Sequence, residues 1–483
     1  MPKRNLIIIV AIIASAVVIM WITRDHTTFV HVDGEMARYR GVADASHVIR
    51  ENYYPVGPAE RTGQAPASSP SELELRRWMV YGMVHGLADE YSRYVPPEDV
   101  RDFETLLSGR SDSLGLRVDL VGDEFRVLGC VLNSPAHREG IMSGDVLLSV
   151  DGQAVAGRRP ADVRRMLQGK ANSRVELVLR RGQTVVTKNP TRQEMTAESV
   201  AGLTRDASGQ WIYLLPAPGE KLAYVRIKEF LKDTPHLVQG ALRSAEQIEG
   251  LVLDLRDNPG GKFESAVDVA DLFVDRGTLC TVLARNAQPL KHSAHPKARC
   301  PDYPIIVLIN ARSASGAEIV AGALAINDRA VLVGTRTRGK GCMQNPFKLD
   351  PELGELNLTT AEYFVGDDQP IARRPGCDAW GVDPHAEVTM TQSLQDELSR
   401  MRLELELAPW PRATAAGATQ PTTAAAYGLE LIHKDRQLLR AIDLLQSPAE
   451  MTGLLNHARE ERLAARAAKA AKGTLPAEKA VEP

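Results

Sequence analysis

Residues 304–326 read PIIVLINARSASGAEIVAGALAI and combine a strand pattern with a helix pattern. Ile305–Ile309 is a continuous apolar run of the length of a buried strand, and Glu318–Ala325 follows it with a helical pattern. A turn of small and polar residues joins the two. A buried strand that leads through such a turn into a helix is typical of an α/β layer structure.

The same order of strand, turn and helix recurs along residues 220–390, which alternate between strand and helix patterns. Leu251–Leu255 is a second buried-strand run, and the turn Pro259-Gly260-Gly261 follows it closely. Backbone N–H groups of a Gly-rich turn can face a ligand, although an ordinary tight turn is the alternative. Asp254 and Arg256 are expected to be structural.

A serine in a strand-to-helix turn can present its hydroxyl beside the N–H groups of a helix N-terminus. This is the arrangement that a nucleophile of acyl transfer needs. Ser313 and Ser315 both lie in the turn that precedes the helix. The alternative is that one of them only caps the helix, which is the more frequent role of such a serine.

Residues 334–341 read GTRTRGKG and match the glycine and lysine positions of a phosphate-binding loop. A true loop of this kind continues with Ser or Thr to hold Mg²⁺, whereas this sequence has Gly341. An ATPase that uses Gly334–Lys340 is therefore a weak alternative, and nucleotide binding would test it. Lys340 lies between two glycines, where the backbone is tight; a solvated lysine is the alternative interpretation.

Three segments together resemble the carboxyl-terminal processing peptidases, or tail-specific proteases, a Ser–Lys peptidase family. They read LDLRDNPGG at 253–261, SASGAEIVAGAL at 313–324 and GKGCMQ at 339–344. Their order and spacing agree with the family. The resemblance covers about residues 35–390 and implies a ClpP/crotonase-like α/β catalytic core.

The resemblance implies Ser315 as the nucleophile, Lys340 as the general base and Gln344 as the residue that orients Lys340. A lysine with an ordinary pKa of about 10.4 is a poor base at neutral pH, so burial must favour its neutral form. The neutral amine can then take the serine proton and return it to the leaving amine. This chemistry requires no cofactor and no metal.

The oxyanion is expected to bind the N–H of Gly316 and an N–H of the turn that contains Gly260 and Gly261. One departure from the family lies near the end of the catalytic region, where Pro384-His385 stands in place of the typical Pro-Asp.

Two other kinds of site are less consistent with the sequence. A His–Asp pair serving Ser315 would be the main rival, but no Gly-x-Ser-x-Gly surrounds the serine. His292 and His295 with Cys300 suggest zinc, yet their spacing fits no standard site, and a surface loop is preferred.

Residues 111–190 resemble a PDZ domain, chiefly through SPAHREGIMSGDVLLSVDG at 134–152 and the loop Ser113–Leu116. Such a loop captures a C-terminal carboxylate, while the peptide adds as a strand beside Leu116–Leu120. A peptide with an apolar C-terminus is the implied partner. The expected contacts, each of which could instead be a core residue, are Leu114, Gly115, Leu116, Val163, Met166 and Leu167.

Residues 6–22 read LIIIVAIIASAVVIMWI, and Lys3 and Arg4 precede this uncharged run. The run predicts a single-pass signal anchor, with a cleaved signal peptide as the alternative. The rest of the chain would then lie on the periplasmic, or extracytoplasmic, side. Disulfides are permitted there, and the sequence leaves open whether Cys280 pairs with Cys300 and Cys342 with Cys377.

The composition is that of an ordinary globular protein, with 483 residues, 44% of them hydrophobic, and a formal net charge of −3. The chain therefore lacks the excess of positive charge that is typical of nucleic-acid-binding proteins. The predicted divisions are a cytoplasmic stub and anchor (1–24), a helical region (30–108), the PDZ domain (109–190), the peptidase core (191–395), and a linker, helix and Ala/Lys-rich tail (396–483).

These inferences predict a membrane-anchored serine endopeptidase that cleaves extracytoplasmic proteins near apolar C-termini, with an activating adaptor as a possible partner. A catalytically inactive PDZ scaffold on the same fold is the alternative. Within the helical region, Leu75, Trp78, Met79, Met83 and Leu87 recur at helical spacing and predict one core-facing side.

Overall fold

The computed structural model describes residues 45, 48, 70–206, 208–216, 221–245, 247–296, 302–408 and 424–471. The predicted anchor at 1–24 lies outside this set, and so do all but two residues of the predicted helical region that precede residue 70. No helix within it is long and apolar enough to cross a bilayer. The chain divides into two compact units, of which the smaller contains residues up to Glu104 and Met343–Ala361, and the larger contains the rest.

In the smaller unit, a short strand interrupts the segment that the sequence predicted as helical. Its elements are α4 (Glu72–His85), β1 (Arg93–Val95), most of α5 (Pro97–Ser108), and most of β19 (Cys342–Lys348) and β20 (Glu355–Val365). Ser71 caps α4 in a capping box with Glu74, whose carboxylate accepts a 2.7 Å bond from the Ser71 N–H. β1 pairs antiparallel with β20, so the expected helical segment is interrupted.

The predicted core-facing side of α4 is wrong. Leu75 and Val84 are buried, but Trp78, Met83 and Leu87 are exposed. The described contacts of α4 are mainly with the short strand β1. A strand of this length cannot cover a whole helix face, so helical periodicity overestimated the burial.

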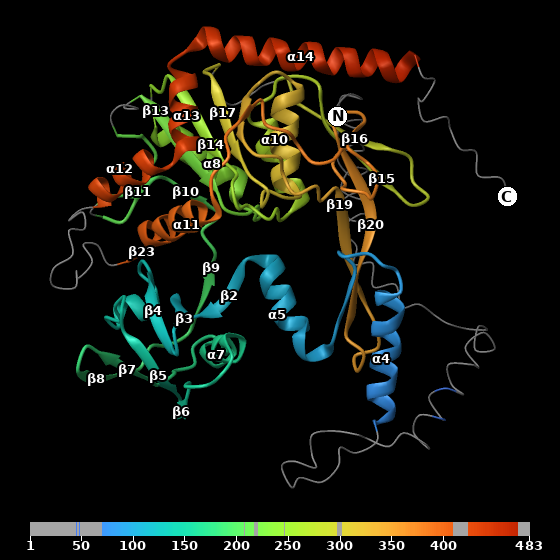
Figure 1. The fold of residues 1–483 in the computed structure, drawn as a ribbon. Helices are drawn as coiled ribbons and strands as arrows, with labels where there is room; N and C mark the ends of the chain where they lie inside the picture. The colour runs from blue at the N-terminus through green and yellow to red at the C-terminus, as the bar shows by residue number, and fades with distance from the viewer. Residues whose placement is uncertain are drawn as a thin grey trace, which may run out of the picture. The chain divides into compact units, whose positions relative to one another are not determined.

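A six-stranded sheet forms the centre of the larger unit (Figure 1). Its strands, in spatial order, are β10 (Val200–Ala201), β13 (Leu222–Ile227), β14 (Gly250–Asp254), β17 (Ile305–Ile309), β18 (Val331–Gly334) and β22 (Ala386–Glu387). The strands from β13 to β22 are parallel, and β10 is antiparallel. Both predicted buried strands are therefore confirmed, and the structure shows that they are neighbours.

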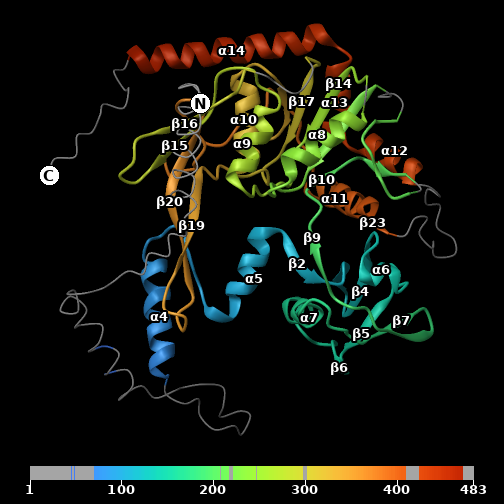
Figure 2. The same cartoon turned by 180° about the vertical axis from the view of Figure 1, so that it is seen from behind.

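Helices cover both faces of this sheet, as Figure 2 shows from the side of α8 and α9. Along β17, Val307 packs in one hydrophobic cluster while Ile306 and Leu308 pack in the other. One cluster includes residues of α8 (Thr234–Ser244), α9 (Phe263–Asp271) and α10 (Gly316–Ile326), and the other includes residues of α11 (Gln392–Glu406), α12 (Ala424–Lys434) and α13 (Arg436–Leu445). Burial on both faces explains why these strands are continuously apolar. The predicted α/β class is confirmed.

A second sheet of the larger unit contains β15 (Thr278–Ala284), β16 (Leu290–Ser293), the end of β20 and β21 (Gln369–Pro370). β21 turns back on β20 with Val365 opposite Gln369. A separate hairpin joins β11 (Thr204–Arg205) to β12 (Trp211–Ile212). These strands place Tyr363 of β20 in the same hydrophobic cluster as α10.

The region that resembles a PDZ domain folds as a seven-stranded sheet with two helices. Its elements are β3 (Leu116–Val121), β4 (Glu124–Val131), α6 (Pro135–Arg138), β5 (Val146–Val150), β6 (Gln153–Ala154), α7 (Pro160–Leu167), β7 (Leu177–Arg181), β8 (Thr184–Lys188) and, from far along the chain, β23 (Leu407–Ala408). The chain enters and leaves this region through the paired strands β2 (Arg110–Ser113) and β9 (Gln193–Thr196). This pairing is what an inserted module requires.

The C-terminal helix α14 (Pro448–Ala471) is more regular than the sequence predicted. The segment from Arg459, which falls in the predicted Ala/Lys-rich tail, continues as helix to Ala471. Arg459 and Arg462 both pair with Asp328, which is distant in sequence. This tertiary contact is invisible to local composition.

His385 gives the structure a pH-dependent contact. Its Nδ1 accepts a 2.9 Å bond from the N–H of Leu332, so the folded protein holds the neutral ring. Burial, and then the positive charge of Arg462, lower its pKa to about 4. The unfolded chain therefore binds a proton that the folded chain does not bind, between about pH 6.5 and this lower value.

We expect the free energy of unfolding to fall as the pH is lowered through this window, by about 2 kcal/mol at pH ~4.5 from His385 alone. His385→Asn, whose amide oxygen can still accept from Leu332, should lose that part of the pH dependence. Urea unfolding of both proteins at neutral pH and at pH ~4.5 measures it. An equal loss of stability in both proteins would contradict the assignment.

Candidate active site

Three predicted motifs follow three neighbouring parallel strands. The Gly-rich turn follows β14, the serine turn follows β17, and the lysine loop follows β18. The carboxyl ends of parallel strands meet at one edge of a sheet, which is where α/β proteins place their sites. Motifs that are far apart in the sequence therefore meet at this edge.

Hydrogen bonds tie the three loops together around Ser313. Its hydroxyl donates to the carbonyl of Leu255 at 2.7 Å, and the N–H of Ala314 donates to the carbonyl of Asn258 at 2.9 Å. The N–H of Arg338 donates to the carbonyl of Ser313, also at 2.9 Å. Ser313 is thus a structural residue of the turn.

Ser315 has an unusual backbone conformation, with φ 56° and ψ −117°, directly before α10 begins. Positive φ is strained for a residue with a Cβ, and such strain is often found at functional positions. A Cβ on Gly260 would lie 2.5 Å from the Ser315 Cβ and 3.0 Å from its hydroxyl oxygen. Only glycine lets the turn after β14 approach the Ser315 side chain this closely.

The expected oxyanion donors differ in availability. The N–H of Gly260 already donates to the Asn258 side-chain oxygen at 2.8 Å. The N–H groups of Gly261 and Gly316 donate to no other group in the part of the chain that the structure describes. Gly261 is solvent-exposed, and Gly316 begins α10. Of the three expected donors, Gly261 and Gly316 can therefore accept a new partner.

Steric crowding explains why glycines lie on either side of Lys340. A Cβ on Gly339 would lie 2.8 Å from the Trp380 ring, and one on Gly341 would lie 2.5 Å from the Ala372 nitrogen. The strand β19 follows this loop, so no helix N-terminus is present to hold a phosphate. The phosphate-binding-loop alternative therefore lacks its structural context.

Glu318 joins the serine and lysine segments, a role that the sequence motifs did not assign to it. Its buried carboxylate accepts bonds from the backbone N–H groups of Ser315 (2.8 Å), Gly339 (2.6 Å) and Lys340 (2.8 Å), and from the Thr337 hydroxyl (2.6 Å). Burial raises its pKa, whereas these hydrogen bonds oppose the shift. The capping-box spacing, a glutamate three residues after the serine, was the signal that could have identified it.

The Glu318 contacts bring the two predicted catalytic residues together. The same carboxylate oxygen accepts from the N–H of Ser315 and from that of Lys340. Both residues are partly exposed, so substrate can reach them. Gln344 belongs to the smaller unit, where its amide donates to Thr359 at 3.2 Å, and its predicted role stays a prediction.

The other candidate sites do not form in the described residues. His295 binds the carboxylate of Asp271 at 2.8 Å, and no cluster of described His, Cys, Asp and Glu residues could hold a metal ion. Cys377 is a thiol, so its possible disulfide with Cys342 is not formed. Cys280 is also a thiol, with a pKa raised to about 12 by burial, and Cys300 lies outside the described residues.

The expected PDZ contacts separate into two groups. Leu114 and Val163 are buried in the core of the module, whereas Leu116, Met166 and Leu167 are only partly buried at its edge. The helix α7 packs against β3, the strand beside which a peptide would add. The three partly buried residues are those that a peptide could contact. Gly115 lies very close to Ser134: a Cβ on Gly115 would lie 2.2 Å from the Ser134 Cβ. This close approach explains why the loop has a glycine at this position.

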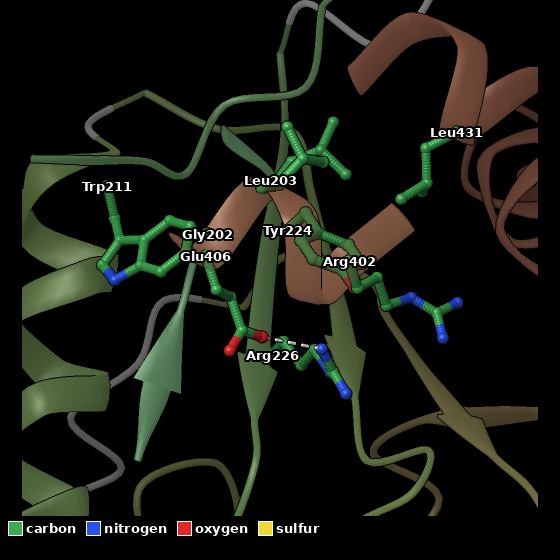
Figure 3. A pocket seen from close by; sticks show the side chains of 9 residues that line it. Gly202, Leu203, Trp211, Tyr224, Arg226, Arg402, Glu406 and Leu431 are labelled. Atoms are coloured by element: carbon green, nitrogen blue, oxygen red, sulfur yellow. Dashed lines mark hydrogen bonds and ion pairs between the residues drawn. The ribbon is translucent and has the colours of Figure 1, made fainter. Parts of the chain in front are cut away.

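A small hollow elsewhere in the larger unit contains none of the predicted site residues (Figure 3). Trp211, Tyr224 and Leu431 line it, and Arg226 donates to Glu406 across it at 3.0 Å. Its volume is about 10 Å³, room for about one water molecule. It is therefore too small to be the substrate site.

Comparison with protein families identifies two regions of the chain. Residues 221–388 match the model of peptidase family S41, and residues 127–181 match a PDZ domain. The first match contains Ser315, Lys340 and Glu318, and the second contains α7 and three strands of the PDZ-like sheet.

Two curated relatives are C-terminal processing proteases. A chloroplastic C-terminal processing peptidase of Tetradesmus obliquus is 33% identical over 327 residues, which are 65% of this chain and 67% of that protein. The carboxy-terminal processing protease CtpA of Bacillus subtilis is 28% identical over 64% of this chain and 63% of its own length. The chain thus spans about two thirds of these relatives. A solved photosystem II D1 C-terminal processing protease is 28% identical, and the match covers 72% of this chain and 92% of that chain with a TM-score of 0.40.

Proposed function

The chain belongs to peptidase family S41, as a serine peptidase of the C-terminal processing type with a PDZ domain, and we propose that Ser315 is its nucleophile and Lys340 its general base. One observation carries this assignment. A single buried carboxylate, Glu318, holds the backbone of both residues at the shared edge of the parallel strands.

In the proposed mechanism, the Ser315 hydroxyl oxygen attacks the substrate carbonyl while the neutral Lys340 amine takes its proton. The N–H groups of Gly261 and Gly316 stabilise the negative oxygen that forms. Lys340 then returns the proton to the leaving amine, and an acyl-enzyme remains. Water, deprotonated by Lys340, attacks the acyl carbonyl, and its proton passes back to Ser315. Gln344 is proposed to orient the Lys340 amine.

The PDZ module is proposed to bind the C-terminal tail of the substrate. Its partly buried residues Leu116, Met166 and Leu167 would contact an apolar side chain, while the peptide adds as a strand beside β3. The proposed substrates are therefore proteins with apolar C-termini.

We also propose that the protein acts at the membrane, anchored by the uncharged run Leu6–Ile22, with its catalytic region on the extracytoplasmic side. An adaptor protein is a further proposed partner, because a peptidase that cleaves other proteins needs control.

Cleavage of an unfolded reporter protein tests the function and the tail preference together. A reporter that ends in an apolar tail should be cleaved with a KM at least about tenfold lower than the same reporter ending in Asp-Asp. The physical reason is that a charged side chain would lose its water against Leu116 and Met166. Met166→Glu should remove most of this preference.

Arg164→Glu is the matched control, because Arg164 is an exposed residue of the same helix. It should keep the preference. Cleavage of both reporters with equal KM by the wild type would contradict tail recognition. A wild-type protein that cleaves neither reporter would favour the inactive-scaffold alternative.

A further inference from the structure

A cavity of about 590 Å³ lies in the larger unit between α10 and the C-terminal helix α14, which crosses one end of α10 (Figure 1). The end of β20, the strand β21 and the segment 379–385 form its other walls. We call this cavity the α14 groove. Its volume lies within the range of about 300–1,000 Å³ that is typical of ligand sites. The described residues that line the groove include none of the predicted catalytic or PDZ residues.

One wall of the α14 groove is fixed by hydrogen bonds to the lysine loop. The N–H of Val382 donates to the Thr337 hydroxyl oxygen at 2.8 Å, and the N–H of Thr337 donates to the Val382 carbonyl at 3.1 Å. The next residue, Asp383, accepts a 3.0 Å bond from the Arg336 side chain. This wall therefore needs no occupant to hold its shape, as is usual for ligand sites.

Much of the lining of the α14 groove is apolar. Ala325, Val365 and Val382 are buried, whereas Ile326 and Leu454 are partly buried. These side chains come from α10, β20, the segment 379–385 and α14. An apolar side chain that enters the groove would lose its contact with water against them, which favours binding.

His385 supplies a hydrogen-bond donor in this lining. Its Nδ1 accepts from the N–H of Leu332, so the ring proton is on Nε2. Nε2 donates to no group in the part of the chain that the structure describes. Burial, and then the charge of Arg462, lower the pKa of His385 to about 4, so the ring stays neutral at pH ~7. An occupant with an oxygen acceptor can therefore bind this N–H.

The charges of the α14 groove disfavour an ion as its occupant. A cation bound at His385 would lie near the positive charge of Arg462, which also lines the groove. An anion would meet the exposed carboxylates of Asp368 and Glu461 in the same lining. An uncharged ligand avoids both repulsions.

A peptide amide matches these polar groups because it is uncharged and has one acceptor and one donor. Its carbonyl can accept from His385 Nε2. Its N–H can donate to an exposed carboxylate of the lining or to the side-chain oxygen of Gln369, which also lines the groove. The apolar side chain beside the amide would then pack on the apolar lining.

We propose that the α14 groove binds an uncharged, apolar segment of a partner protein, with a backbone carbonyl of that segment accepting from His385. This site differs in kind from the PDZ module, which is proposed to take a free C-terminus, because a carboxylate is disfavoured here. Such binding goes beyond the proposed peptidase function and does not depend on the Ser315–Lys340 pair.

N-acetylleucine N-methylamide is an uncharged probe that has both the amide groups and an apolar side chain. It should bind the full chain with a Kd of about 1 mM, as expected for about 13 non-hydrogen atoms. The chain carries Ser315→Ala, which excludes turnover by the proposed nucleophile. N-acetylleucine, an anion, and leucine N-methylamide, a cation, should bind at least about fivefold more weakly. Ligand-observed NMR titration measures all three.

Two adjacent alanines of α14 locate the binding. Ala464 and Ala465 are both exposed, but only Ala465 lines the groove. Ala465→Trp should weaken binding of the uncharged probe at least about fivefold because the ring occupies part of the groove, whereas Ala464→Trp should match the parent chain. Absence of saturable binding below about 10 mM overturns the proposal. Equal Kd values in the two variants also overturn it, because the probe would then bind elsewhere.

Two adjacent glutamates test the charge argument without adding bulk. Glu460 and Glu461 are both exposed, but only Glu461 lines the groove. Glu461→Lys should tighten the binding of N-acetylleucine about two- to fivefold, and Glu460→Lys should leave it unchanged. An equal effect of both variants, or tighter binding of either ion than of the uncharged probe by the parent chain, overturns the assignment of an uncharged occupant.

The two proposals can fail separately. A wild-type chain that cleaves no reporter, yet binds the uncharged probe in the α14 groove, contradicts only the proposed peptidase function. A chain that cleaves the reporter but does not bind the probe contradicts only the proposed groove.

Discussion

Ser315→Ala is expected to lower kcat for reporter cleavage by about 10⁴-fold or more, because the proposed mechanism forms the acyl-enzyme on the Ser315 oxygen. Substrate binding should change little, since the alanine leaves the Glu318 contact to the backbone N–H in place. Steady-state kinetics at saturating reporter measures the effect. Lys340→Met should cause a comparable loss, because its side chain has no proton acceptor.

Ser315→Gly provides the control for folding. Glycine adopts φ 56° without the strain that serine bears, so this variant should be inactive yet at least as stable as the wild type. Thermal unfolding of both variants separates loss of chemistry from loss of structure. Near-wild-type cleavage by Ser315→Ala would falsify the nucleophile assignment.

Arg256→Met is expected to destabilise the protein by about 3–5 kcal/mol, because it leaves buried carboxylates without their cation. Arg256 is 1% exposed and donates two bonds to Asp254, at 2.9 and 2.6 Å, and one to Asp435 at 2.8 Å. Although burial acts to raise it, the pKa of Asp254 is held below its ordinary value chiefly by Arg256. Urea unfolding at neutral pH measures the loss.

Arg440→Met is the matched control. Arg440 of α13 forms a partly exposed ion pair with Glu450 of α14. Such pairs contribute about 0–1 kcal/mol, so this variant should remain close to wild type. A loss of stability in Arg256→Met no larger than that in Arg440→Met would mean that the buried network contributes little.

The Arg256 network also joins the C-terminal helices to the rest of the larger unit. Asp435 caps α13, yet its carboxylate binds Arg256, which follows β14 and precedes the Gly-rich turn. Arg402 of α11 donates to the same Asp435 at 2.7 Å. The sequence predicted that Arg256 is structural, but its partner across the sheet could not be identified from local pattern.

Local features of the sequence determined the fold class and the order of the motifs. Buried-strand runs predicted β14 and β17, the resemblance of residues 111–190 predicted a PDZ module, and the Ser–Lys resemblance identified the loops that the structure brings together. These signals are readable because strand burial, helix periodicity and turn chemistry depend on neighbouring residues.

Tertiary structure alone decided which groups surround the serine. Three hydrogen bonds between side chains and backbone illustrate this. Asn258 binds Gly260, Glu318 binds the lysine loop at Gly339, and Tyr363 binds Lys340. No residue pattern specifies their geometry. The exposed face of α4 also depends on tertiary structure, because helical periodicity does not indicate the size of the strand that packs against the helix. Such contacts depend on which strands become neighbours in the folded chain, and spacing along the sequence does not contain that information.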